Sequence, residues 1–423
     1  MPFGLEFKDG SPGLQKEWFM KHSVAVFGIA VVALSVGAFL LPGPVQAADE
    51  VKINGFTLVV PESSIPRPGR IHTNYFIARS EVSNPSGPPP GTETPGSLAC
   101  VYKLVKGPEG CPIATSTTVP TGGWGAIAIV DAGHYPTAKA DLHAFSSYFG
   151  IPDADFQIVY ANGKKPPVYD DWLVEEALDI EWAHAMAPKA KLFLVESKLC
   201  TTSCNTDPSW QAIKVAGELV AKNGGGVVSM SFGDPEAHSD LSHDKLFTQP
   251  GVVYFAASGD SGIGVGIYPG ASPNVVSVGG TVFNRDTKGN FVSEWYATDG
   301  GGGDISAYEP RPAYQDVIKA IVGSKRGYPD VASDFCCAPI YLEGQWGGVA
   351  GTSWSSPTFA GIVNAAGSKA KSSNDELTAI YKEYANKTQY KADFHDITMG
   401  DSHCTKGWDV CAGVGSPRTY KGK

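Results

Sequence analysis

The run Val253-Tyr254-Phe255-Ala256-Ala257-Ser258-Gly259-Asp260-Ser261-Gly262 is a short apolar strand that ends in a polar turn. Similar apolar runs lie on both sides of it in the chain, and helical patterns separate many of them. We expect strands at 56–60, 126–130, 156–160, 191–195, 226–229, 252–257 and 275–278, and helices at 138–149, 172–186 and 210–222. Continuous apolar strands separated by helices are typical of a parallel sheet covered on both faces. The sequence therefore predicts an α/β domain with a mostly parallel central sheet and helices on both faces.

Polar residues that directly follow these strands are the first candidates for chemistry, because such sheets bind ligands at the carboxyl ends of their strands. Asp260 follows the strand 252–257. When protonated, its carboxyl group could donate a hydrogen bond to an oxyanion, alongside a backbone N–H group. Taken alone, Asp-Ser-Gly is also an ordinary turn.

The motif Gly351-Thr352-Ser353-Trp354-Ser355-Ser356-Pro357 follows a glycine-rich loop and precedes an apolar helical run at 359–366. A serine at the entrance of a helix lies beside free backbone N–H groups, which can hold a developing oxyanion. The commoner role of such a sequence is an N-cap serine with Pro357 in the first turn. Ser353 is therefore a candidate nucleophile that needs partners.

Glu175 and Asp179 lie one helical turn apart and project from the same face of the expected helix 172–186. Apolar residues cover most of this helix, so we expect it to be buried. Two carboxylates this close can share a hydrogen bond and a proton, which raises one pKa and allows proton transfer in acidic medium. For an isolated pair with this spacing, a solvated acidic patch is the commoner meaning.

These segments together resemble the sedolisin family of serine-carboxyl peptidases. The matching motifs, in family order, are Glu175-x-x-Leu178-Asp179-Ile180-Glu181, Ala187-Pro188, Ser258-Gly259-Asp260-Ser261-Gly262, Tyr268-Pro269, Val278-Gly279-Gly280-Thr281, Pro329-Asp330-Val331 and Gly351-Thr352-Ser353. The resemblance covers residues 94–417. It implies a subtilisin-like fold with a Ser-Glu-Asp triad and an aspartate in the oxyanion hole.

The resemblance also implies a role for each site residue. Ser353 attacks the scissile carbonyl, Glu175 takes its proton, Asp179 orients and shares charge with Glu175, and Asp260 stabilises the tetrahedral intermediate. A glutamate base, with a reference pKa of about 4.3, works best in acidic medium. We therefore expect a secreted endopeptidase that acts on proteins or peptides at acidic pH through an acyl-enzyme, and a tripeptidyl aminopeptidase of the same family is the alternative.

Two other readings compete with this one. A subtilisin-type Ser-His-Asp enzyme would use Asp131 and a histidine, but the helix carries Glu175 near its start, and His184 lies more than two turns beyond it. An inactive, exported binding protein on a peptidase scaffold belongs to a different functional class. The presence of all four groups that the chemistry requires argues against an inactive protein. These groups belong to Ser353, Glu175, Asp179 and Asp260.

A calcium site is implied by the resemblance of the C-terminal segment to that of the family. Carboxylates of Asp396 and Asp409, with backbone carbonyls of Ile397, Thr405 and Gly407, would form an oxygen shell for one structural Ca²⁺. The alternative is a pair of turn aspartates around a tryptophan. Thr405 stands where a glycine is common in the family.

The N-terminal region differs from the family pattern. Residues 1–48 resemble a signal peptide, and Met20 is its expected true start. The signal peptide predicts an extracellular or periplasmic protein. If the apolar run 24–41 is retained, it would instead anchor the chain in a membrane. Residues 49–95 form a short extension that ends in a Pro-rich linker, and residues 96–423 form the peptidase domain. The extension is too short for the family's large prodomain. It either leaves the enzyme to fold unaided or is a reduced pro-segment that is removed near the linker.

Composition adds three expectations. The net charge of −10 argues against a nucleic-acid partner, and we expect a monomer. No CxxC pair or histidine cluster has zinc spacing. The eight cysteines favour the disulfides Cys100–Cys111, Cys200–Cys204 and Cys404–Cys411, whereas a bond between the adjacent Cys336 and Cys337 would be strained, with free thiols as the alternative.

Overall fold

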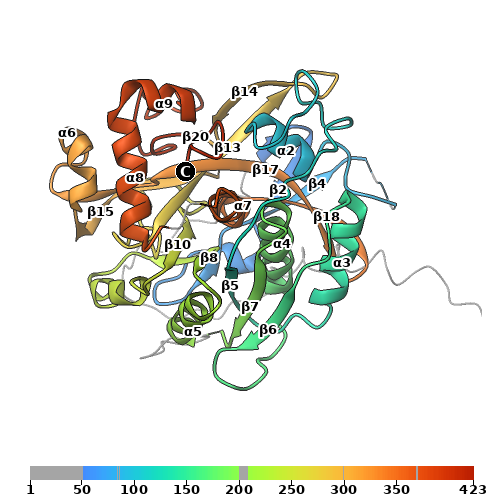
Figure 1. Cartoon of the computed structure of the whole chain (residues 1–423), viewed down its shortest axis with the longest axis horizontal. Helices are drawn as coiled ribbons and strands as arrows, with labels where there is room; N and C mark the ends of the chain where they lie inside the picture. The colour runs from blue at the N-terminus through green and yellow to red at the C-terminus, as the bar shows by residue number, and fades with distance from the viewer. Residues whose placement is uncertain (1–50, 83, 85, 200–207, 299, 368–369) are drawn as a thin grey trace, which may run out of the picture. The chain divides into compact units, whose positions relative to one another are not determined.

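A large β-sheet forms the centre of the domain (Figure 1). Its strand order is β1-β2-β4-β18-β17-β13-β10-β8-β5-β7-β6, and β14 pairs with β13. A computed structural model describes residues 51–423 except 83, 85, 200–207, 299 and 368–369. The strands of this sheet are β1 (Val51–Ile53), β2 (Phe56–Val59), β4 (Phe76–Ser80), β5 (Ala126–Ala132), β6 (Phe156–Tyr160), β7 (Lys191–Ser197), β8 (Gly226–Met230), β10 (Val252–Ala257), β13 (Val276–Arg285), β14 (Phe291–Tyr296), β17 (Val331–Leu342) and β18 (Gln345–Ala350).

Pairing is parallel from β6 through β17 and antiparallel beyond β17. The prediction of a mostly parallel sheet is thus confirmed. Strand β13 extends well past the expected end at Val278 although Gly279 and Gly280 interrupt the apolar run. It continues because β17 and β14 pair with it on both sides.

The helices connect these strands in the order expected from the sequence. Their bounds are α2 (Pro95–Val101), α3 (Ala138–Phe149), α4 (Asp170–Met186), α5 (Pro208–Lys222), α6 (Lys319–Val322), α7 (Thr352–Ala365), α8 (Ser373–Ala385) and α9 (Lys387–Asp393). The shorter strands are β3 (His72–Thr73), β9 (Phe232–Pro235), β11 (Gly262–Ile263), β12 (Ile267–Tyr268), β15 (Gly302–Pro310), β16 (Lys325–Tyr328), β19 (Phe394–His395) and β20 (Ser416–Pro417). None of the helices within the described ranges is long and apolar enough to cross a membrane.

Helices cover both faces of the sheet, as predicted. Val228 and Met230 of β8 belong to the buried cluster that contains residues of α5. Ser229, between them, points to the opposite face and lies 3.0 Å from Ser356 of α7, oxygen to oxygen. Helices α5 and α7 therefore pack on opposite faces, and α4 lies beside α7 (Figure 1).

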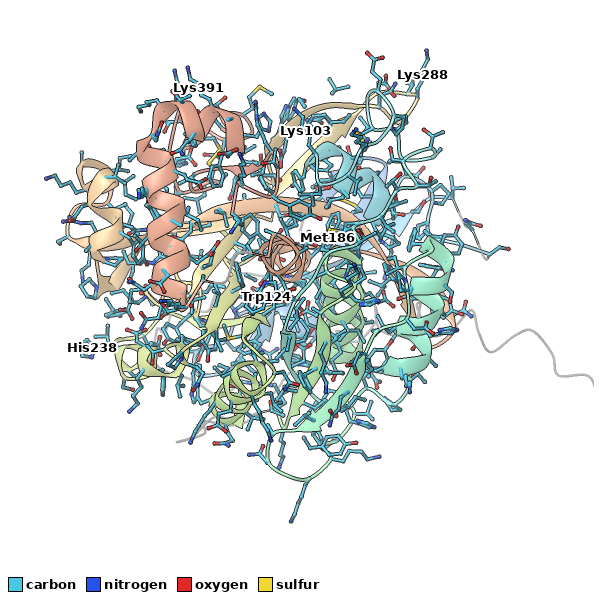
Figure 2. All side chains as sticks on the ribbon, in the orientation of Figure 1. Lys103, Trp124, Met186, His238, Lys288 and Lys391 are labelled. Atoms are coloured by element: carbon cyan, nitrogen blue, oxygen red, sulfur yellow. A yellow bond between two sulfur atoms is a disulfide. The ribbon has the colours of Figure 1, made fainter. Side chains whose placement is uncertain are left out.

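Helices α4 and α7 approach closely because α7 carries a glycine at the contact. A Cβ atom on Gly361 would lie 2.6 Å from the Cβ of Met186. Met186 ends α4 beside α7 (Figure 2). This close contact fixes the acidic helix against the helix that carries Ser353.

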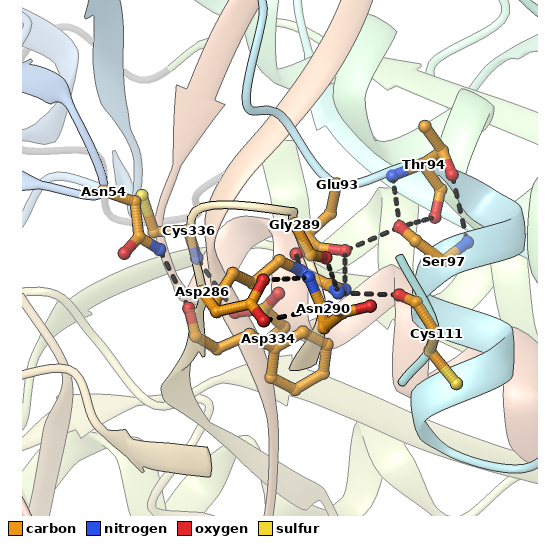
Figure 3. Close-up of polar contacts among 12 residues, drawn as sticks. Asn54, Glu93, Thr94, Ser97, Cys111, Asp286, Gly289, Asn290, Asp334 and Cys336 are labelled. Carbon is orange, nitrogen blue, oxygen red and sulfur yellow. Dashed lines mark hydrogen bonds and ion pairs between the residues drawn. The ribbon is translucent and has the colours of Figure 1, made fainter. Parts of the chain in front are cut away.

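The segment after residue 50 is part of the same folded unit as the rest of the described chain. Strand β4 pairs with β18 and β2, so the extension adds strands to the central sheet. Glu93, at the end of the Pro-rich run, accepts hydrogen bonds from Ser97 Oγ (2.6 Å) and Arg285 Nη2 (2.6 Å) (Figure 3). Residues 51–95 are thus tied to the domain at both ends.

Disulfides join Cys100 to Cys111 and Cys404 to Cys411, as predicted. Cys200 and Cys204 lie outside the described residues. Cys336 and Cys337 are also bonded to each other, so the free-thiol alternative is wrong. Their Cα atoms are only 3.0 Å apart, which brings the two sulfur atoms within reach.

Candidate active site

Helix α4 carries its acidic residues into the interior of the domain. Glu175, Glu176, Asp179 and Glu181 are all fully buried. The helix packs against α3, α7 and the sheet and presents no solvent-exposed face between Trp172 and Met186. The alternative of a solvated acidic patch is therefore wrong.

Ser353 lies in the first turn of α7, two residues after its N-cap residue Gly351. Gly351 has a φ of +143°, a backbone conformation that favours glycine. Pro357 lies inside the helix and cannot donate a hydrogen bond to the carbonyl of Ser353. The alternative of an N-cap serine with Pro357 in the first turn is thus wrong, because the helix begins earlier than the apolar run indicates.

Ser231 occupies the position between the nucleophile candidate and the acidic helix. Its Oγ lies 2.8 Å from both carboxyl oxygens of Asp179 and 3.1 Å from the Ser353 carbonyl oxygen that Pro357 leaves free. The Ser231 carbonyl in turn accepts a hydrogen bond from Ser353 Oγ at 2.9 Å. Ser231 therefore contacts Ser353 through both its hydroxyl and its carbonyl group, and the same hydroxyl contacts Asp179.

The Ser353 hydroxyl acts on the pKa of Glu175. Burial raises the pKa of Glu175 well above its usual value, Asp179 and Asp131 raise it further, and the Ser353 hydroxyl opposes the shift. Neither oxygen of Glu175 has a well-aligned hydrogen-bond partner among the described residues. The expected side-chain hydrogen bond between Glu175 and Asp179 is therefore not formed, and the two groups interact through their charges.

Asp179 and Asp131 belong to the same group of buried acids. Burial raises the pKa of Asp179, and the charge of Asp131 adds to the shift. Burial also raises the pKa of Asp131 to about 8, with a further contribution from Glu196. Like charges this close cannot all ionise together, so the group retains protons at pH values where isolated carboxyls have lost theirs.

Asp260 faces the start of α7 from the turn after β10. Its Oδ1 accepts hydrogen bonds from Thr352 N at 2.9 Å and Thr352 Oγ1 at 2.6 Å. Its Oδ2 is buried with no partner within the described part of the chain. Burial raises the pKa of Asp260 well above the usual value, against the effect of Thr352. Burial thus favours the protonated form of this carboxyl group, in which Oδ2 can donate.

Sequence reasoning did not assign three residues of this site, namely Asn74, Ser231 and Thr352. Thr352 stands in the motif that contains Ser353, and Ser231 follows shortly after the expected strand 226–229; these positions were the available signals. Nothing near Asn74 in the sequence indicates its place. His184, in contrast, points away from the site, because its Nε2 lies 2.7 Å from the carbonyl oxygen of Pro152.

The predicted calcium residues lie together in the C-terminal loop. Asp396 accepts hydrogen bonds from Gly407 N at 3.0 and 3.2 Å, and Asp409 accepts one from Thr405 N at 2.6 Å. Burial raises the pKa of Asp409 to about 7, and Asp396 contributes to the shift. In the described ranges, no three His, Cys, Asp or Glu side chains form a metal-binding cluster. A cation here would depend on two carboxylates and backbone carbonyls.

Comparison with known proteins gives several relatives. Kumamolisin from Bacillus sp. (strain MN-32) is 31% identical over 288 residues, which cover 57% of this chain and 49% of that protein. Sedolisin from Pseudomonas sp. (strain 101) is 25% identical over 350 residues, or 72% of this chain and 58% of that protein. Tripeptidyl-peptidase 1 of Dictyostelium discoideum is 25% identical over 320 residues, or 66% and 51%. The chain thus spans about half the length of these relatives. No family model matches the sequence.

Solved structures show the same fold. A Pseudomonas sedolisin, described as a serine-carboxyl proteinase in complex with two molecules of pseudo-iodotyrostatin, superposes with a TM-score of 0.62 at 22% identity. The match covers 79% of this chain and 96% of that chain. The domain therefore has a subtilisin-like fold, with a serine at a helix start beside buried carboxyl groups. In sequence, the chain is similar to kumamolisin and sedolisin, which supports membership of the sedolisin family.

Proposed function

We propose that the chain is a serine-carboxyl peptidase that hydrolyses peptide bonds in acidic medium through an acyl-enzyme on Ser353. The observation that carries this proposal is the convergence of three elements on one serine. Helix α7 presents Ser353, α4 presents the Glu175–Asp179 pair, and the turn after β10 presents the buried carboxyl group of Asp260. Relatives named kumamolisin, sedolisin and tripeptidyl-peptidase support the same activity.

In this mechanism Ser353 Oγ rotates from the Ser231 carbonyl toward Glu175 and attacks the scissile carbonyl. Glu175 accepts the proton and later returns it to the leaving amine. Asp179 shares charge with Glu175 and is fixed by Ser231. The Ser353 N–H and the protonated Asp260 donate hydrogen bonds to the developing oxyanion.

The pH profile is expected to be bell-shaped, with its maximum below pH 7. Activity rises with pH as the Glu175–Asp179 pair ionises, at a midpoint above the reference value of about 4.3. Burial raises both pKa values, the charge of Asp179 adds to the shift of Glu175, and the charge of Asp131 adds to both. It falls as Asp260 loses the proton that it donates. The measurement is hydrolysis of a peptide library from pH 3 to 8, and a maximum above pH 7 rejects Glu175 as the base.

The variant Asp260→Asn separates the two limbs of this profile. An asparagine keeps an acceptor for Thr352 and a donor for the oxyanion, but it does not titrate. We expect the alkaline limb to move to higher pH while the acid limb stays in place. An unchanged alkaline limb would assign it to another group. If the chain is instead an exported binding protein on the same scaffold, no hydrolysis is expected at any pH.

We also propose that the C-terminal loop binds one structural Ca²⁺. Asp396 and Asp409 would supply carboxylates, with carbonyls of Ile397, Thr405 and Gly407 completing an oxygen shell of the kind Ca²⁺ prefers. The two carboxyl groups fit a cation because they repel each other, and Asp409 is buried.

Removing calcium is expected to lower the melting temperature. A ligand at 100 times its Kd stabilises the folded state by about 2.7 kcal/mol, and a chelator removes this contribution. The melting temperature is measured with and without EDTA, and Asp396→Asn serves as the control that no longer responds. No response of the unmodified protein, or an equal response of the variant, would reject the site.

Export through residues 1–48 is also proposed, although these residues lie outside the described part of the chain. The disulfides Cys100–Cys111 and Cys404–Cys411 support it, because such bonds persist in oxidising compartments.

A further inference from the structure

A cavity of about 830 Å³ lies among the C-terminal elements of the domain. Residues of α8, α9 and β19 line it, together with Lys406, Gly407 and Arg418. No lining residue belongs to α4, to α7 or to the turn after β10, so this C-terminal cavity is separate from the site around Ser353. It shares Asp396 and Gly407 with the calcium site proposed above.

Four cationic side chains line the C-terminal cavity, namely those of Lys387, Lys391, Lys406 and Arg418. All four residues are exposed. None of the four forms an ion pair with a carboxylate of the described residues, whereas Arg285 does. Lysine and arginine are charged in neutral and acidic medium, and like charges gathered in one hollow repel one another. A bound anion would therefore lower the free energy of this arrangement.

Hydrogen bonds bring Arg418 against α9. Arg418 N donates to the Asp393 carbonyl oxygen at 2.8 Å, and Arg418 Nη1 donates to the Lys391 carbonyl oxygen at 3.4 Å. A guanidinium group can hold two oxygens of one phosphate through parallel N–H groups. The contact with α9 uses only one nitrogen of the Arg418 side chain, so its other N–H groups are available to a ligand.

The two lysines of α9 face the same side of that helix. Lys387 and Lys391 are four residues apart, which places neighbouring side chains one helical turn from each other. Figure 2 shows Lys391 on α9 at the surface of the domain. Two cations at this spacing destabilise an isolated helix slightly. The pair therefore adds to the positive charge of the cavity without adding to the stability of α9.

The acidic residue of the lining, Asp396, is engaged elsewhere. Both of its oxygens accept the N–H of Gly407, at 3.0 and 3.2 Å. Tyr390, which also lines the cavity, is only 7% exposed, and its hydroxyl has no well-aligned partner within the described residues. Burial and the nearby Asp396 raise the pKa of Tyr390, which keeps its O–H as a donor.

We propose that the C-terminal cavity binds a soluble ligand that carries two phosphate groups. At pH 7 a phosphate monoester has a charge of about −1.5 to −2, so two such groups match the four cations. The volume lies within the range of small-molecule sites and exceeds that of a single ion. The concave shape favours a soluble ligand over a flat membrane surface. The proposal does not depend on the peptidase activity.

The net charge of the chain makes this site specific to its place. With a net charge of −10, the chain as a whole repels an anion. Binding of a bisphosphate therefore requires a local group of cations, and it should weaken as the salt concentration rises.

The test is calorimetric titration of the full chain at pH 7 and constant ionic strength with fructose 1,6-bisphosphate, fructose 6-phosphate and fructose. We expect the bisphosphate to bind about tenfold or more tightly than the monophosphate, and fructose not to bind, because each phosphate adds charge-assisted hydrogen bonds. Absence of bisphosphate binding in the millimolar range, or equal binding of fructose, would overturn the proposal. Binding only to vesicles of equal parts phosphatidylcholine and phosphatidylglycerol would overturn the choice of a soluble ligand.

Three variants locate the site. Lys391→Ala and Arg418→Gln should each weaken bisphosphate binding by about tenfold, which is the usual effect of losing a hydrogen bond to a charged group. Lys288→Ala is the matched control, because Lys288 is also an exposed lysine but lies on another part of the domain (Figure 2). The Lys391 side chain is exposed, so Lys391→Ala should keep the melting temperature of the unmodified protein. Equal weakening by Lys288→Ala, or unchanged binding by Lys391→Ala, would show general attraction rather than a site at the cavity.

Discussion

Replacing Ser353 by alanine is expected to lower kcat/KM for peptide hydrolysis by about 10⁴-fold or more, because the acyl-enzyme can no longer form. The fold should survive, since the hydrogen bonds of Ser353 Oγ within the described residues are to Ser231 O and from Asn74 N, both of which are backbone atoms. The measurement is steady-state kinetics on a peptide substrate under identical conditions for every variant.

Ser356→Ala is the matched control, because Ser356 lies one turn further along α7 and contacts Ser229 on the sheet. Its loss should cost about 1 kcal/mol of stability and leave kcat/KM within a few-fold of the unmodified protein. Comparable losses in both variants would show that any serine-to-alanine change disturbs α7, and would remove the case for a nucleophile.

Replacing Glu175 by glutamine is expected to reduce kcat by about 10³-fold or more, because an amide cannot accept the proton of Ser353. The glutamine resembles the protonated carboxyl, which is the form that burial favours in the folded protein. The variant should therefore fold normally and bind substrate with little change in KM. Steady-state kinetics between pH 3 and 8 measure both parameters.

Glu181→Gln is the control on the same helix. Glu181 is equally buried, but its oxygens accept the N–H of Tyr341, away from Ser353. A glutamine retains an acceptor for this N–H, so activity should be preserved. If Glu181→Gln loses as much activity as Glu175→Gln, the losses reflect a disturbed helix rather than a missing base.

The parallel half of the sheet could be predicted because its strands are apolar runs and its helices have clear patterns. Strands β17 and β18 are harder to detect, since β17 contains the polar pair Ser333 and Asp334, which lie buried among long-range partners. The Pro-rich run resembles a linker by composition. Glu93, near its end, nevertheless accepts a hydrogen bond from Arg285, which is far along the chain and leaves no local signal.

The main site residues could be predicted because each stands in a motif of its own. The order of these motifs along the chain indicated that the residues belong to one site. Spacing alone wrongly indicated a hydrogen bond between Glu175 and Asp179, because the helix periodicity does not fix side-chain rotamers. Asn74 could not be found in the same way. It contacts Ser353 through backbone atoms, which any residue type carries, so its role depends on the path of the chain.

The most direct test of the central claim is to map by mass spectrometry the covalent adduct that a serine-directed fluorophosphonate forms on the protein. The adduct should form on Ser353, and its rate of formation should rise with pH as the Glu175–Asp179 pair ionises and fall sharply in Glu175→Gln. An adduct on another residue, or labelling of Ser353 at the same rate with glutamine at position 175, would contradict a serine nucleophile activated by Glu175.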